Sequence, residues 1–171
     1  MKTKEILALA RNTNTSDLVR EASNIRDKGH GSLVTYSPKV FIPLTHLCRD
    51  VCHYCTFAKT PKKVSSPYMS LKEVIDSAKN AELLGCKEAL FTLGERPELR
   101  YSTARKALAN MGYQSTLEYL KEASKAVIES TELLPHLNPG CMTYQEIEEL
   151  RPVAASMGMM LESSSKRLCE K

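Results

Sequence analysis

Three cysteines within eight residues constrain this chain more than any other feature of its sequence. They have the spacing C-x3-C-x2-C, directly after an apolar stretch, at Cys48, Cys52 and Cys55. Three soft thiolate ligands in one short loop suit an iron-sulfur cluster. A four-iron cluster held by only three cysteines keeps one iron without a protein ligand, and such an open position can accept a substrate or cosubstrate. The spacing therefore favours a reactive metal centre over a purely structural one.

Two other uses of these cysteines compete with a cluster. A structural zinc site needs a fourth ligand, such as His46, His53 or a distant cysteine, and His53 is awkwardly adjacent to Cys52. A disulfide framework is disfavoured, because the apolar run at residues 6–10 is shorter than a signal-peptide core. We therefore expect a reduced, cytoplasmic chain. The other thiols are expected to be one small buried side chain and two incidental groups, at Cys86, Cys141 and Cys169.

The composition is that of an ordinary soluble globular protein. Of 171 residues, 42% are hydrophobic and 26% are charged, and the net charge is +4. No apolar segment approaches the ~20 residues that a membrane span requires. The mild positive charge is not accompanied by a basic stripe or an aromatic platform, so nucleic-acid binding is not expected. Lys62 and Lys63 are therefore expected to lie in a solvated loop.

Segments with the apolar patterns of strands and helices alternate along the chain. Buried strands are predicted at residues 40–44, 89–93, 133–137 and 159–162, although Pro135 is unfavourable within the third. A first helix is expected after a cap at Ser16, and a short one at residues 102–111. Three more helices are expected to begin at the capping pairs Ser70 with Glu73, Ser115 with Glu118, and Thr143 with Glu146. This order predicts an α/β fold with a parallel sheet, whose functional loops follow the strands on one rim.

The cysteine loop also resembles that of a known family. Tyr54, just before the third cysteine, completes the C-x3-C-x-aromatic-C pattern of the radical S-adenosylmethionine (SAM) superfamily. Within it, the chain is similar to the G subunits of the 7,8-didemethyl-8-hydroxy-5-deazariboflavin synthases, from about residue 32 onward. The similar segments are residues 35–50, 56–58, 91–98, 134–140 and 160–165.

This resemblance implies a partial TIM-type barrel, which radical SAM enzymes usually close with six strand-helix units. About four strands and three crossovers are expected here, so residues 1–31 would be a helical lead-in and residues 32–171 an incomplete, N-terminal portion of the barrel. A fourth strand at the edge would leave backbone groups unpaired. Either the sequence is truncated at the C-terminus or a partner supplies the missing units. We expect a truncated sequence, without full activity of its own.

The resemblance further implies two cofactors, a [4Fe-4S] cluster and SAM. The cluster would be held by the thiolates of Cys48, Cys52 and Cys55, and the methionine group of SAM would chelate the fourth iron. Gly94 and Glu95 stand where the superfamily has Gly-Gly-Glu, with Leu93 replacing the first glycine. Glu95 would accept a hydrogen bond from the SAM ammonium group, and its alternative role is that of a solvated loop carboxylate.

Other SAM contacts are implied for residues near the strand ends. Tyr54 would stack near the adenine or pack behind the cluster, and Glu162 and Ser163 would meet the ribose or methionine part. His136 and Asn138 are equally compatible with loop-capping roles. No catalytic acid or base is assigned.

The implied reaction is a radical ring closure with loss of ammonia, which would make the enzyme a carbon-nitrogen lyase. Its small-molecule substrate would be a tyrosine-derived adduct of 5-amino-6-ribitylaminouracil, supplied by a companion H subunit, and the product a deazaflavin coenzyme chromophore. A low-potential electron donor would reduce the cluster. The alternatives are another radical SAM enzyme of the same branch, such as the H subunit or a menaquinone-pathway relative, and a noncatalytic zinc-binding domain.

Overall fold

The computed structural model describes residues 3–11, 14–161 and 163–169. The chain forms two compact units, residues 1–36 and residues 37–171. We describe each unit by itself.

The described residues of the first unit form two helices, α1 (Thr3–Arg11) and α2 (Thr15–His30). Sequence patterns did not predict α1. The predicted cap of α2 at Ser16 was wrong, because the side chain of Asn14 accepts the N–H of Asp17 at 3.3 Å. An Asn side chain caps a helix as well as Ser does, and Ser16 lies within the first turn.

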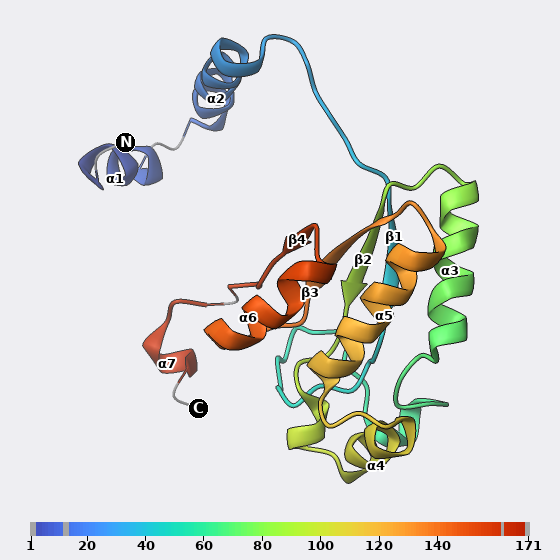
Figure 1. The fold of residues 1–171 in the computed structure, drawn as a ribbon. Coiled ribbons are helices and arrows are strands. Elements are labelled where there is room, and N and C mark those ends of the chain that lie inside the picture. Colours follow the sequence, from blue (N-terminus) through green and yellow to red (C-terminus); the bar gives the residue numbers. More distant parts are fainter. Residues whose placement is uncertain (1–2, 12–13, 162, 170–171) are drawn as a thin grey trace. The chain divides into compact units, whose positions relative to one another are not determined.

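The second unit is built on a four-stranded parallel sheet (Figure 1). Its strands follow one another in chain order, as β1 (Lys39–Pro43), β2 (Glu88–Thr92), β3 (Leu134–Asn138) and β4 (Ser156–Met157). The first three predicted strands are confirmed to within one residue at each end. Each connection between neighbouring strands contains at least one helix, so the predicted three crossovers are also confirmed.

The fourth strand lies earlier than predicted. β4 pairs with His136 and Leu137, and its ladder ends where the N–H of Gly158 donates to the carbonyl of Leu137 at 2.9 Å. The prediction of a strand at residues 159–162 was therefore wrong, and Glu162 itself lies outside the described residues. The apolar run after Gly158 finds no buried surface to pack on, since exposed side chains occur at Met159, Met160 and Leu161.

Among the residues of the second unit that the structure describes, five α-helices accompany the strands. They are α3 (Leu71–Leu83), α4 (Ser102–Met111), α5 (Thr116–Ser130), α6 (Tyr144–Leu150) and α7 (Lys166–Cys169). The predicted capping boxes are confirmed at the starts of α3 and α6, and Ser115 caps α5 by accepting the N–H of Glu118 at 3.1 Å. None of the described helices is long and apolar enough to cross a membrane.

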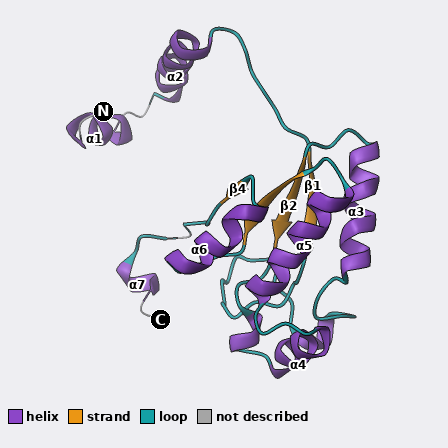
Figure 2. Cartoon of the chain, in the orientation of Figure 1, coloured by secondary structure: helices purple, strands orange, loops and turns teal. Residues whose placement is uncertain are grey.

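The two faces of the sheet differ in what covers them. α3 packs against β1 and α5, and α5 also packs against β3, so the two helices cover one face (Figure 2). Fully buried side chains point to this face from every long strand, for example Ile42, Phe91 and Leu137. Residues that alternate with them point to the other face, where Phe41 is 52% exposed. The hydrophobic core therefore lies between the sheet and α3 and α5, and the opposite face stays open.

Candidate functional site

The carboxyl end of the sheet carries a cavity of ≈ 260 Å³ that brings most of the predicted site together. Cys48, Cys52 and Cys55 line it from the loop after β1, and Gly94 and Glu95 line it from the loop after β2. The loop after β3 contributes further lining residues, Asn138, Gly140 and Cys141. Loops at the carboxyl ends of parallel strands meet at one rim, as the sequence predicts.

Backbone hydrogen bonds join the first two of these loops. The N–H of Gly94 donates to the carbonyl of Thr45 at 2.9 Å, and the N–H of Arg49 donates to the carbonyl of Glu95 at 2.8 Å. The approach is so close that a Cβ at Gly94 would lie 1.9 Å from the carbonyl oxygen of Leu47. Glycine is therefore required at position 94 to place Glu95 beside the cysteine loop.

The three thiols share the cavity without forming a finished metal site. Cys48 is half-buried, and its sulfur accepts the N–H groups of Asp50 at 3.4 Å and Glu95 at 3.3 Å. Burial raises the pKa of the Cys48 thiol, and these two N–H groups partly offset the effect. Cys52 and Cys55 are exposed. Within the described part of the chain, no three His, Cys, Asp or Glu side chains are already grouped for a metal ion.

Glu95 lies at the centre of the rim rather than in solvent. Its side chain is 12% exposed and forms an ion pair with Arg49, while its other carboxylate oxygen accepts the N–H of Cys141 at 3.3 Å. The turn at Gly140 makes room for it, because a Cβ there would lie 2.5 Å from that oxygen. Burial, followed by the charge of Glu95, raises the pKa of Asp50 on the cysteine loop. Arg49 and the N–H of Cys141 therefore fix the position of the Glu95 carboxylate in the same cavity as the thiols.

The residue after Glu95 fixes the loop in an uncommon conformation. Arg96 has a left-handed backbone, with φ of 35°, which costs a non-glycine residue free energy. Its side chain donates to the carbonyl of Cys141 at 3.1 Å and to the carboxylate of Glu146 at 2.6 Å. This ion pair is the largest cause that lowers the pKa of Glu146 to about 2. Arg96 therefore ties the loop after β2 to the loop after β3 and to α6.

A second anchor of this loop is the buried carboxylate of Glu98. Its two oxygens accept the backbone N–H of Thr116 at 3.2 Å and the Thr116 hydroxyl at 2.6 Å. Because that hydroxyl gives its proton to Glu98, it accepts the proton of Tyr68, 2.7 Å away. Burial raises the pKa of Tyr68. Sequence patterns did not reveal this network, since its members are far apart in the chain.

The other residues that the sequence predicts for the site do not all line the cavity. Tyr54 lines the cavity and is 67% exposed. Ser163 is a described residue but is not among those that line the cavity, and Glu162 lies outside the described residues. Cys141, expected to be incidental, lines the cavity beside the three predicted ligands. Cys86 is half-buried against the core, close to the buried position that was expected.

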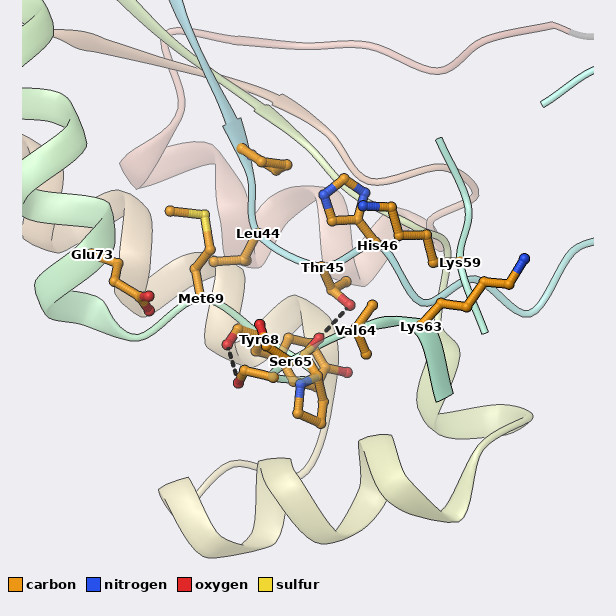
Figure 3. Close-up of a pocket in the computed structure, with 13 residues that line it drawn as sticks. Leu44, Thr45, His46, Lys59, Lys63, Val64, Ser65, Tyr68, Met69 and Glu73 are labelled. Carbon is orange, nitrogen blue, oxygen red and sulfur yellow. Dashed lines mark hydrogen bonds between the residues drawn. The ribbon is translucent and has the colours of Figure 1, made fainter. Parts of the chain in front are cut away.

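A second cavity, of ≈ 290 Å³, lies between the end of β1 and residues 59–69 (Figure 3). Figure 3 marks the hydrogen bond from the Thr45 hydroxyl to the carbonyl of Pro67, at 2.7 Å, and shows Lys63 pointing away from the other side chains. His46 lines this cavity, and its Nδ1 lies 3.0 Å from the carbonyl oxygen of Phe57. Because this cavity lacks the three thiols, the arrangement does not favour His46 as a fourth zinc ligand.

Comparisons of the sequence identify FO synthases as relatives. The FO synthase of Mycobacterium tuberculosis is 50% identical over 179 residues, which cover 96% of this chain and 21% of that protein. The FO synthase of Nocardia farcinica is 51% identical over 172 residues, covering 95% of this chain and 20% of the relative. The 7,8-didemethyl-8-hydroxy-5-deazariboflavin synthase of Methanopyrus kandleri is 50% identical over 138 residues, which cover 81% of this chain and 41% of that protein. The chain thus spans about a fifth of the FO synthases that it matches.

Comparisons of the fold give two radical SAM enzymes. The FeFe-hydrogenase maturase HydG of Carboxydothermus hydrogenoformans superposes with a TM-score of 0.62 at 24% identity, covering 88% of this chain and 32% of HydG. Methylornithine synthase (PylB) superposes with a TM-score of 0.64 at 18% identity, covering 94% of this chain and 43% of PylB. No protein-family model matches the chain. Sequence and fold together show that the chain is homologous to one part of the FO synthases and has the fold, a partial barrel, of the radical SAM enzymes.

Proposed function

We propose that this chain supplies the cluster-binding part of a radical SAM enzyme that forms the 7,8-didemethyl-8-hydroxy-5-deazariboflavin chromophore. The observation that carries the proposal is the shared cavity, in which three thiols at C-x3-C-x2-C spacing lie beside Glu95 at the carboxyl end of a parallel sheet. The 50% identity to FO synthases supports this reaction over that of another radical SAM enzyme of the same branch.

The donor set of the cavity fits a [4Fe-4S] cluster with one open iron. The thiolates of Cys48, Cys52 and Cys55 would hold three irons and leave the fourth iron without a protein ligand. When bound, the cluster and SAM supply one-electron reductive cleavage of SAM and hence radical chemistry. Cys52 and Cys55 are exposed, so their thiols are accessible to a cluster, and metal binding can organise its own ligands.

The protein side chains would bind and orient SAM at this cluster. Glu95 is held by Arg49 and by the N–H of Cys141, and a carboxylate has further lone pairs for the SAM ammonium group. Gly94 permits the close approach that brings Glu95 beside the thiols. Tyr54 lines the same cavity and would contact the adenine. For Glu162 and Ser163, contact with SAM remains a prediction.

The substrate and partners belong to the same proposal. The substrate would be the tyrosine-derived adduct of 5-amino-6-ribitylaminouracil from a companion H subunit, and ring closure would release ammonia. A low-potential donor would supply the electron, and the location would be cytoplasmic. The residues of this chain that support the proposal are those of the cavity, to which we assign cluster and SAM binding.

The proposal is tested by titrating SAM anaerobically into the reconstituted chain and its Glu95→Gln variant. Glu95 would meet SAM and not iron, so the variant should keep its iron while SAM binding weakens by about 1 to 3 kcal/mol, the range for a hydrogen bond to a charged group. Glu149→Gln, an exposed carboxylate on α6, is the matched control and should bind SAM normally. Unchanged SAM affinity in Glu95→Gln would refute the role of Glu95, and zinc in place of iron would refute the proposed function.

A further inference from the structure

The open face of the sheet carries a row of polar side chains that the site described above does not use. The row crosses all four strands, from Lys39 on β1 through Glu88 on β2 and His136 on β3 to Ser156 on β4. Lys39 and Glu88 form an ion pair at 2.5 Å, and Nδ1 of His136 lies 3.7 Å from the same Glu88 carboxylate. These polar side chains share the open face with apolar ones such as Phe41, and they contact one another across the strands.

Contacts at Nδ1 determine how the His136 ring is held. Nδ1 lies 2.8 Å from the hydroxyl oxygen of Ser156, and the Glu88 carboxylate lies on the same side. A carboxylate nearby favours a proton on Nδ1, which then donates to the Ser156 oxygen. The bond made by one ring nitrogen sets the state of the other, so Nε2 carries a lone pair. The contacts thus select a tautomer that can accept a proton at Nε2.

The other ring nitrogen of His136 lies near Gly158, the residue that follows β4. Nε2 of His136 and Oδ1 of Asn138 both lie 3.7 Å from the point that a Cβ on Gly158 would occupy. Asn138 lines the cavity with the three thiols, and Met159, the residue after Gly158, lines it too. Nε2 has no hydrogen-bond partner among the residues that the structure describes, and the His136 side chain is 30% exposed. A ligand that extends from the cavity over this face would therefore meet a free proton acceptor.

We propose that His136 is a substrate-binding base of this site, which uses Nε2 to accept a proton from an N–H or O–H group of a polar, heteroaromatic substrate. Asn138 would provide a neighbouring amide for the same ligand. Ser156 and Glu88 would be positioning residues, because they act through Nδ1. The class of substrate rests on the proposed function, whereas the state of the imidazole does not.

The proton transfer is balanced without any oxidant. A substrate N–H or O–H bond breaks, its electron pair stays on the substrate heteroatom, and a new N–H bond forms at Nε2. The positive charge on the ring is stabilised by Glu88, which remains ionised because the Lys39 ion pair lowers its pKa. Solvent then takes the proton from the imidazolium and restores the base.

The first test reads the tautomer directly by 15N NMR of the histidine side chains in the full chain. We expect Nδ1–H for His136, and also for His46, whose Nδ1 faces a carbonyl oxygen that can only accept. His30 and His53 are exposed and should show the Nε2–H form of free histidine. In the double variant Ser156→Ala with Glu88→Gln, His136 should change to Nε2–H. An Nε2–H tautomer for His136 in the unmodified chain would overturn the proposal.

The second test measures binding of the deazaflavin 7,8-didemethyl-8-hydroxy-5-deazariboflavin as a probe. Its addition should move the His136 signals, and His136→Gln should weaken its binding at least fivefold, whereas His30→Gln in the first unit should not. Unmoved His136 signals, or equal affinity of the two variants, would refute the role of His136. Iron content is measured in parallel. If the unmodified chain holds no iron, the proposed function is contradicted. If it holds iron but His136→Gln and His30→Gln bind the probe equally well, only the present inference is contradicted.

Discussion

The loops that follow β1 and β2 line the same cavity and are bonded to each other, but they differ in the exposure of the side chains that they bring to it. The loop after β1 carries the three thiols, two of which are exposed, and they are not yet grouped for a metal ion. The loop after β2 is held at Gly94 by backbone contacts, at Arg96 by an ion pair, and at Glu98 by a buried network. The carboxylate of Glu95 is thus fixed by its neighbours, whereas two of the three thiols in the same cavity are exposed.

This difference agrees with the binding roles that we propose for the two loops. Metal binding releases enough free energy to organise its own ligands, so a cysteine loop does not have to be rigid beforehand. A carboxylate that orients a cosubstrate has no such source of ordering and must be held by its neighbours. We therefore expect substitutions in the loop after β2 to alter the stability of the fold, and substitutions of the exposed thiols to alter metal content alone.

The largest effect on stability is expected for Gly94→Ala. The added Cβ would lie 1.9 Å from the backbone oxygen of Leu47, so the two loops would have to separate, at a cost of about 3 kcal/mol or more. Urea unfolding measures it. Gly85→Ala is the control, because Gly85 also has a special backbone, with φ of 84°, but open space around its Cβ position. Equal costs for the two variants would mean that the close approach of the loops is unimportant.

A smaller effect is expected for Glu98→Gln. The amide cannot accept both the N–H and the hydroxyl of Thr116, so one buried donor loses its partner, at about 1 to 3 kcal/mol. Glu129→Gln is the control, since Glu129 is exposed and its ion pair with Lys125 measures 3.7 Å. Thermal unfolding of both variants gives the comparison. A Glu98 variant as stable as the Glu129 variant would contradict the anchoring role.

The smallest effect is expected for Glu146→Gln, at about 1 kcal/mol near neutral pH, because Gln keeps the capping box and loses only the charge facing Arg96. The pKa of Glu146 is lowered from 4.5 to about 2, so its contribution is present above pH 4.5 and is lost as the pH falls through about 2. Urea unfolding of both proteins across this range should show the difference shrinking toward low pH. A difference that grows on acidification would have the wrong sign.

The sequence predicted correctly those element ends that are set by residues close to one another in the chain. Ser70 with Glu73 and Thr143 with Glu146 marked helix starts correctly, because a capping box needs only residues three apart. The fourth strand was misplaced because hydrophobicity does not determine register. Its position is set by backbone bonds to β3, such as the one from Ala155 to Pro135 at 2.9 Å, and these depend on tertiary structure.

The residues of the candidate site also fall into two groups, those with a local sequence signal and those without one. The spacing of the three cysteines and the Gly94-Glu95 pair are local, and the structure places all of them on one cavity. The left-handed backbone of Arg96 and the buried contact of Glu98 with Thr116 have no local signature, since each partner comes from another element. His136 was not assigned as a base because its contacts with Glu88 and Ser156 arise only when three strands pair.

The most direct measurement of the central claim is the iron and sulfide content of the anaerobically reconstituted chain, compared with Cys52→Ala and Cys86→Ala. Cys52 is exposed in the cysteine loop and Cys86 packs against the core, so the two variants separate a ligand from a structural thiol. We expect about four irons in the unmodified chain and in Cys86→Ala, and loss of the cluster in Cys52→Ala. A full iron complement in Cys52→Ala, or tightly bound zinc instead of iron, would contradict the account.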